Sequence, residues 1–259
     1  MNLERLEDDV DLLEEQEDGF TAARPILYED PDGTMSLFFR IGEVQSQMSG
    51  DAPDDLVLAY TRTMMAFLLF NEAPRRIAMI GLGGGSMAKW CYRQLPQTHI
   101  TVVEINPHVI DLREHFHIPE DDARFRVLCE DGAAYVAETA DRPDVLIVDG
   151  FDAEGQPPEL CSQSFYDDCH RALHVDGMMV VNLCDPQDEV HIARIRRSFG
   201  DRVLVATFAD GENKIVFAGK GDGLWPEDVS DDGFGLELME RLNTLNVSCV
   251  DLANRGRQP

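Results

Sequence analysis

Carboxylates stand at or shortly after the ends of three short apolar runs of this sequence. The runs cover residues 99–103, 125–128 and 145–148, and the carboxylates that follow them are Glu104, Asp131, Asp149 and Asp152. A carboxylate can accept hydrogen bonds from hydroxyl and amino groups, take up a proton or offset the charge of a cation. Because ligands of an open parallel sheet bind where its strands end, we expect all four to face one site.

A glycine loop, Gly81-Leu82-Gly83-Gly84-Gly85, follows a fourth apolar run at residues 77–80. Glycines let a ligand approach the backbone, and the N-terminus of the following helix adds partial positive charge. The alternative is a tight turn packed under a helix. Glu104, about 20 residues beyond the loop, is placed to accept hydrogen bonds from both ribose hydroxyls. Loop and acid together predict a nucleoside site whose contacts are Gly81, Gly83, Gly85 and Glu104.

NAD and S-adenosyl compounds both use such a loop and acid, so the next strand ends must decide between them. Asp131, which precedes Gly132, is positioned to accept a hydrogen bond from an adenine amino group. It also suits the N-cap of a helix over residues 132–139, and the two roles are compatible. Asp149 and Asp152 stand where the reacting end of the ligand is expected. A carboxylate-capped turn is the alternative interpretation of this pair.

The spacing of apolar residues predicts a small sheet followed by a larger α/β domain. Strand and helix patterns alternate from the glycine loop to about residue 200, which implies a parallel sheet with right-handed crossovers. The other expected elements are strands at 26–28, 35–41 and 44–47, a buried helix at 54–70, a closing pair of strands at 203–208 and 214–218 joined by a turn at Asp210-Gly211, and a final helix at 234–245.

The predicted fold class is therefore α/β, with a Rossmann-like sheet of the type found in S-adenosylmethionine-dependent methyltransferases. A small N-terminal β-sheet precedes it. The predicted organisation is an acidic N-terminal segment at residues 1–20, a small β domain at 21–50 and a Rossmann-like catalytic domain at 51–259. Apolar residues make up 44% of the chain, which is enough for a full core.

The composition limits the partners of this protein. With 22 basic against 49 acidic residues, the formal net charge of −27 repels a phosphate backbone and would attract a polycation, although acidity also serves solubility. The six cysteines form no CxxC pair and indicate reduced thiols of a cytoplasmic protein. His170 and His174 have no third ligand at clear spacing, so no metal site is expected. No export signal or membrane-spanning run is apparent.

At these residues the chain resembles the spermidine synthase family, the polyamine aminopropyltransferases, over about residues 25–218. It is most similar to the divergent spermidine synthase-like branch of that family. The segments that carry the resemblance are Gly42-Glu43-Val44-Gln45, the gate-helix tyrosine Tyr60, Val103-Glu104-Ile105-Asn106, Asp131-Gly132, Asp149-x-x-Asp152 and Phe165-Tyr166 with the helix that follows. The resemblance implies that Tyr60, Gln45 and Asp152 bind the amine substrate and that Asp149 is catalytic.

Several residues depart from the family pattern. Gly84 stands where authentic synthases carry the aspartate that approaches the amine of the donor's aminopropyl tail. Thr61 replaces the histidine or glutamine after the gate tyrosine, Ala23 aligns with a glutamine, and Ala153 replaces a proline. These differences concern the choice of donor and of amine.

The reaction implied by the resemblance is an in-line displacement. An amine nitrogen attacks the carbon bonded to the sulfonium of decarboxylated S-adenosylmethionine, and 5′-methylthioadenosine leaves. Three alternatives remain at this point: methyl transfer from S-adenosylmethionine itself, a non-catalytic nucleoside-binding module, and an NAD-dependent dehydrogenase. The last has no obvious hydride-handling residues beside its glycine loop. The expected partner is a small-molecule amine, with no nucleic acid, no membrane and no metal. A homodimer is compatible with the sequence.

Overall fold

The structure is a computed structural model that describes residues 23–40, 43–184, 186–200, 202–207 and 213–221. The first of its two sheets is antiparallel and has the order β1-β2-β3. Its strands are β1 (Ile26–Glu29), β2 (Met35–Arg40) and β3 (Glu43–Met48). Asp32 and Gly33 form the turn between β1 and β2: the Thr34 amide donates to the Asp32 carboxylate, and Gly33 has a positive φ of 80°.

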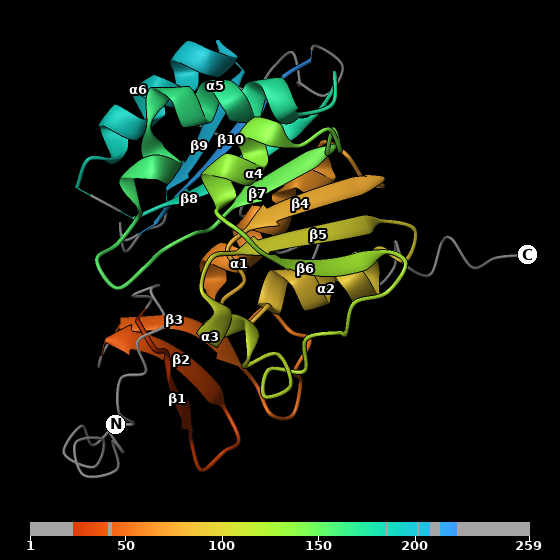
Figure 1. The fold of residues 1–259 in the computed structure, drawn as a ribbon, viewed down its shortest axis with the longest axis vertical. Coiled ribbons are helices and arrows are strands. Elements are labelled where there is room, and N and C mark those ends of the chain that lie inside the picture. Colours follow the sequence, from red (N-terminus) through yellow and green to blue (C-terminus); the bar gives the residue numbers. More distant parts are fainter. Residues whose placement is uncertain (1–22, 41–42, 185, 201, 208–212, 222–259) are drawn as a thin grey trace, which may run out of the picture.

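The second sheet has seven strands in the order β6-β5-β4-β7-β8-β10-β9 (Figure 1). The first five of these are parallel, and β10 is antiparallel to both of its neighbours. The strands are β4 (Arg76–Ile80), β5 (His99–Glu104), β6 (Phe125–Cys129), β7 (Val145–Val148), β8 (Met178–Leu183), β9 (Val203–Thr207) and β10 (Lys214–Gly219). The predicted fold class and its antiparallel closing strand are thus confirmed.

Strand order reverses at β4, because β5 lies on one side of it and β7 on the other. Such a reversal opens a crevice at the carboxyl ends of the strands, where ligands of doubly wound sheets bind. The glycine loop follows β4, so the fold places this loop directly at the crevice.

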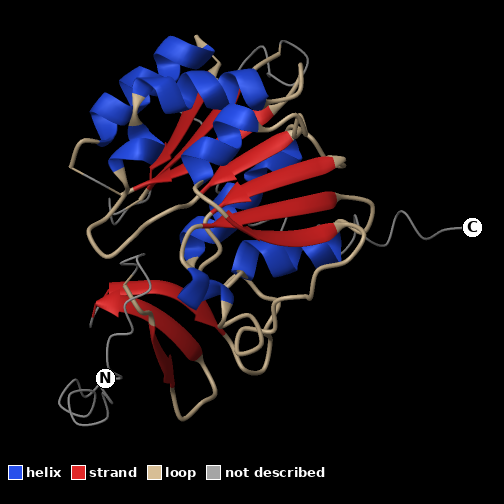
Figure 2. Cartoon of the chain, viewed as in Figure 1, coloured by secondary structure: helices blue, strands red, loops and turns tan. Residues whose placement is uncertain are grey.

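Helices cover both faces of the large sheet (Figure 2). Alternate residues of each strand point to opposite faces: Ile77 and Met79 of β4 join one buried apolar cluster, whereas Ala78 and Ile80 join the other. The helices are α1 (Ala59–Met64), α2 (Ser86–Gln94), α3 (Pro107–Ile110), α4 (Gly132–Glu138), α5 (Gln163–Ala172) and α6 (Asp188–Phe199), with short 3₁₀ helices η2 (Met65–Leu69) and η3 (Pro158–Cys161). A sheet buried on both faces explains the nearly continuous apolar runs of its strands.

The helix predicted over residues 54–70 is shorter than expected. It begins only at Ala59 and passes into the 3₁₀ helix η2 after Met64. The residues before it remain in turns because the Arg62 guanidinium donates to the carbonyls of Leu56 and Val57, at 2.6 and 2.9 Å. The acidic N-terminal segment, the turn at residues 210–211 and the final helix at 234–245 lie outside the described residues. Within the described part of the chain, no helix has the length and apolar character needed to cross a membrane.

Candidate active site

A cavity of about 1690 Å³ opens at the carboxyl ends of the parallel strands around β4. Nine of the ten predicted site residues line it: Gln45, Tyr60, Gly81, Gly83, Glu104, Asp131, Gly132, Asp149 and Asp152. The tenth, Gly85, is buried and does not line the cavity; it precedes α2 in the left-handed conformation, with φ 65°. A Cβ at Gly85 would lie 2.5 Å from Ile118, so this glycine serves packing of the loop.

The first glycine of the loop allows two strand ends to meet. Gly81 has a positive φ of 95°, and its amide donates to the carbonyl of Val103 at 2.9 Å. A Cβ at this position would lie 2.2 Å from the backbone oxygen of Asp149. Only glycine fits such a close approach, so Gly81 sets the position of Asp149 beside the loop.

Glu104 joins the glycine loop to the end of β5. One carboxylate oxygen accepts from the Leu82 amide at 2.9 Å and the other accepts from the Asn106 amide at 2.8 Å. Burial raises the pKa of Glu104, and the backbone hydrogen bonds oppose that shift. The amides of Ile105 and Gly83 also act on this carboxylate, which lines the cavity wall.

Asp131 caps helix α4, which is one of the two roles expected of it. Its Oδ1 accepts from the Ala134 amide at 2.7 Å, while Oδ2 makes no hydrogen bond within the described part of the chain. The following Gly132 is buried, and a Cβ there would lie 2.4 Å from a methyl carbon of Ile80. This glycine therefore lets the start of α4 pack on β4, and the exposed carboxylate faces the cavity.

Asp149 is held by two side-chain donors at the end of β7. The Tyr60 hydroxyl lies 3.2 Å from its Oδ2, and the Asn182 amide nitrogen lies 2.9 Å from its Oδ1. Burial raises the pKa of Asp149, and the hydrogen bonds from Asn182 and Tyr60 oppose this rise. The pKa of Tyr60 is raised well above 10, first by burial and then by the Asp149 carboxylate, so the phenol stays protonated as a donor.

The sequence analysis missed Asn182 and Asn213. Asn182 is 3% exposed in β8, and its own Oδ1 accepts from the Asn213 side chain at 2.9 Å. One signal was available: Asn182 is the polar residue in an otherwise apolar strand, Met-Met-Val-Val-Asn-Leu, that is buried throughout. A buried amide requires partners, and the carboxylate of Asp149 is one of them.

Asp152 lies in a tight turn beyond Asp149. Its backbone pairs with Gly155, and its Oδ1 accepts from the Glu154 amide at 2.8 Å. This is the capped turn considered as the alternative interpretation, but the exposed side chain also lines the cavity. The turn and an amine-binding role are therefore compatible in space.

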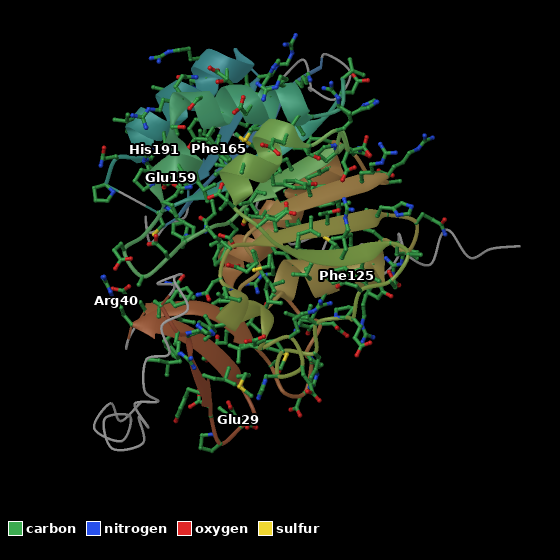
Figure 3. The ribbon with its side chains drawn as sticks, in the orientation of Figure 1. Glu29, Arg40, Phe125, Glu159, Phe165 and His191 are labelled. Atoms are coloured by element: carbon green, nitrogen blue, oxygen red, sulfur yellow. The ribbon has the colours of Figure 1, made fainter. Side chains whose placement is uncertain are left out.

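The cavity is strongly acidic. Seven carboxylates line it against two guanidinium groups, those of Arg24 and Arg40; the carboxylates belong to Glu43, Glu104, Asp131, Asp149, Asp152, Glu154 and Glu159. Arg40 on the small sheet forms an exposed ion pair with Glu154, at 3.4 Å. Figure 3 shows Arg40 on the small sheet and Glu159 on the side of the large sheet's helices. Such a lining favours cationic ligands.

No three His, Cys, Asp or Glu side chains are grouped to hold a metal ion in the part of the chain that the structure describes. The lining of the cavity instead combines a nucleoside-type half, at the glycine loop, Glu104 and Asp131, with a carboxylate half at Asp149 and Asp152. This arrangement suits a transferase that brings a nucleoside donor to a cationic acceptor.

Comparison with known proteins identifies the family. The model of the spermine/spermidine synthase domain matches residues 57–198. The chain is 42% identical over 187 residues to the polyamine aminopropyltransferase of Neisseria meningitidis serogroup A, covering 71% of each chain. It is 37% identical over 221 residues to that of Chromobacterium violaceum, covering 81% of this chain and 85% of the relative. The chain therefore belongs to the spermine/spermidine synthase family, which confirms the predicted resemblance.

Solved structures show the same fold. A probable spermidine synthase from Corynebacterium glutamicum has a TM-score of 0.69 at 22% identity, covering 84% of this chain and 82% of its own. A spermidine synthase bound to the transition-state analogue AdoDATO has a TM-score of 0.63 at 21% identity, covering 87% and 84%. Human methyltransferase-like protein 13, bound to SAH, has a TM-score of 0.59 at 23% identity, covering 72% and 91%.

Proposed function

We propose that this protein is a polyamine aminopropyltransferase that moves the aminopropyl group of decarboxylated S-adenosylmethionine to a di- or polyamine. Family membership supports the reaction class. The observation that carries the assignment of its site is the Asp149 carboxylate, which Tyr60 and Asn182 hold at the wall of the acidic cavity.

In the proposed reaction the amine nitrogen forms a bond to the aminopropyl carbon while the carbon–sulfur bond breaks. The electron pair of that bond stays on sulfur, and neutral 5′-methylthioadenosine leaves. The acceptor is an ammonium ion at neutral pH and its nitrogen has no free electron pair, so Asp149 accepts one proton from it before the nitrogen attacks. No metal ion is needed for this chemistry.

The other residues bind and orient the two substrates. Glu104 accepts hydrogen bonds from the ribose hydroxyls, and Asp131 accepts one from the adenine amino group. Asp152, at the mouth of its loop, offsets the charge of the acceptor, and Gln45 and Tyr60 contact the acceptor from the lining of the same cavity. Holding the nitrogen and the carbon in line supplies a large part of the rate enhancement because it removes the entropy cost of their encounter.

The decisive experiment identifies the leaving nucleoside. The protein is incubated with decarboxylated or intact S-adenosylmethionine and a panel of di- and polyamines, and the products are read by mass spectrometry. Methylthioadenosine and an amine heavier by one aminopropyl group are expected, and the Asp149→Asn variant serves as the matched control. S-adenosylhomocysteine with a methylated amine would instead establish methyl transfer, and absence of any product would favour a binding module.

The cytoplasmic location and the homodimer remain predictions. Cell fractionation tests the first, and light scattering on the purified protein tests the second.

A further inference from the structure

Gly84, which stands at the family's aspartate position, is closed to side chains by its neighbours. A Cβ at Gly84 would lie 2.7 Å from Ser46 Oγ and 2.8 Å from Cδ1 of Phe116. The Phe116 ring is fully buried, and the carbonyl of the same residue accepts from the buried Lys89 ammonium at 2.7 Å. Because this segment is held in place, Phe116 does not move aside easily, and a carboxylate cannot simply be restored at residue 84.

Ser46 takes the space that a side chain at residue 84 would need. It lies in β3 next to Gln45, is 7% exposed and lines the cavity. Its Oγ also lies 3.7 Å from the position of a Cβ at Gly83, so the hydroxyl faces the middle of the glycine loop. This hydroxyl makes no hydrogen bond to another residue in the described part of the chain, and a ligand between the loop and Gln45 would meet it.

We infer that Ser46 sets which S-adenosyl donor the site accepts, and that the site takes intact S-adenosylmethionine as well as the decarboxylated form. This inference rests on the proposed function, because it assumes that the donor's tail runs past the glycine loop. The two donors differ at the end of that tail. The decarboxylated donor carries an ammonium group alone, whereas the intact one carries an ammonium group and a carboxylate.

A carboxylate facing the tail would attract the ammonium group and repel the donor's carboxylate, and so would discriminate strongly. A serine hydroxyl carries no charge, accepts a hydrogen bond from ammonium and donates one to carboxylate. Of the other cavity acids, Glu104 and Asp131 are assigned to the nucleoside, and Asp149 and Asp152 to the reacting end. The carboxylates of Glu43, Glu154 and Glu159 are exposed, so solvent screens them, and all of these acids favour the decarboxylated donor only through its larger net charge. The expected preference is therefore small.

The test measures binding by calorimetry and needs no turnover. Three ligands are titrated: S-adenosylmethionine, its decarboxylated form, and methylthioadenosine, which has no charged tail. The unmodified protein should prefer the decarboxylated donor by less than about tenfold. Ser46→Asp should widen that preference by about a hundredfold, mainly through weaker binding of the intact donor. Ser46→Asn introduces a side chain of the same shape as aspartate but without charge, and it should leave the preference near that of the unmodified protein.

Methylthioadenosine separates the ways in which the inference can fail. If it does not bind the unmodified protein, the nucleoside site of the proposed function is wrong. If it binds, but the unmodified protein prefers the decarboxylated donor by much more than tenfold, or Ser46→Asp and Ser46→Asn give equal preferences, the role of Ser46 is refuted alone. If Ser46→Asp loses methylthioadenosine through misfolding, the preference of the unmodified protein decides the question.

Discussion

Replacing Asn182 by alanine tests the proposed role of Asp149 without touching the carboxylate itself. The Asn182 amide is one of two side-chain donors to Asp149, and it lies 2.9 Å from Oδ1. It stabilises the charged form of the acid against burial, which raises the pKa of Asp149. In Asn182→Ala the Tyr60 hydroxyl bond remains, at 3.2 Å. The pKa of Asp149 should therefore rise further.

The size of the effect follows from the lost hydrogen bond. A hydrogen bond to a charged group contributes about 1.5 to 3 kcal/mol. On the acid side of the pH profile, Asp149 is largely protonated and cannot accept a proton from the amine. There this loss corresponds to a roughly ten- to hundredfold lower kcat/KM. At higher pH the carboxylate is charged in both proteins, so the difference should shrink.

The assay is the pH dependence of kcat/KM for methylthioadenosine release, measured for the unmodified protein and for two variants. Asn182→Ala should move the acid limb of the profile to higher pH. Asn213→Ala, which removes only the donor to Asn182 Oδ1, should move it in the same direction by less. A loss of activity that is equal at every pH would refute the reasoning, because Asn182 would then merely shape the cavity.

Three further predictions concern binding, turnover and stability. Glu104→Ala should weaken methylthioadenosine binding by about 1.5 to 3 kcal/mol in calorimetry; unchanged affinity would exclude a ribose contact. Asp149→Asn should lower turnover about 10² or more with donor binding intact, whereas Asp152→Asn should chiefly raise the KM of the amine; full turnover in Asp149→Asn would remove its role. Burial lowers the pKa of Lys89 to about 8, so the unfolded state binds more protons above that pH. Relative to Lys89→Met, the free energy of unfolding of the unmodified protein should rise by about 2 to 3 kcal/mol between pH 8 and 10.5. Buried thiols and phenols with raised pKa, such as Cys91 and Tyr166, oppose this rise equally in both proteins and cancel in the comparison.

The sequence predicted the parts of the site that depend on strand order. Ends of parallel strands meet at one edge of a sheet, so the acids after β5, β6 and β7 had to lie near the loop after β4 once the α/β alternation was recognised. The positions of Glu104 and Asp149 follow from this strand order alone. The roles of the individual loop glycines could not be predicted from the sequence, because these glycines serve different purposes. Gly81 opens space for the Asp149 backbone, while Gly85 packs under Ile118 away from the cavity.

Contacts between distant side chains could not be read from the sequence. Asn182 meets Asp149, which is 33 residues away, and Asn213 meets Asn182 across 31 residues. The first contact depends on the parallel pairing of β7 with β8, and the second on the antiparallel pairing of β8 with β10. The lack of space for a side chain at Gly84 likewise depends on residues that are distant in the sequence. The resemblance to the family indicates that its aspartate is absent there, but only the packing of Phe116 and Ser46 shows that its place is filled.

The charge of the cavity creates a conflict that the surroundings of Asp149 can resolve. Carboxylates around the site bind an ammonium substrate well, yet the same field stabilises its charged form and so opposes loss of the proton that must precede attack. An exposed acid such as Asp152 suits binding, because it has only to offset the substrate's charge; solvent weakens such an exposed charge pair but does not abolish it. A base must do more. Burial that raises the pKa of Asp149 makes its carboxylate a better proton acceptor, while Tyr60 and Asn182 keep that acid charged and correctly oriented until the amine arrives. We therefore assign proton acceptance to Asp149 and binding of the substrate's positive charge to Asp152.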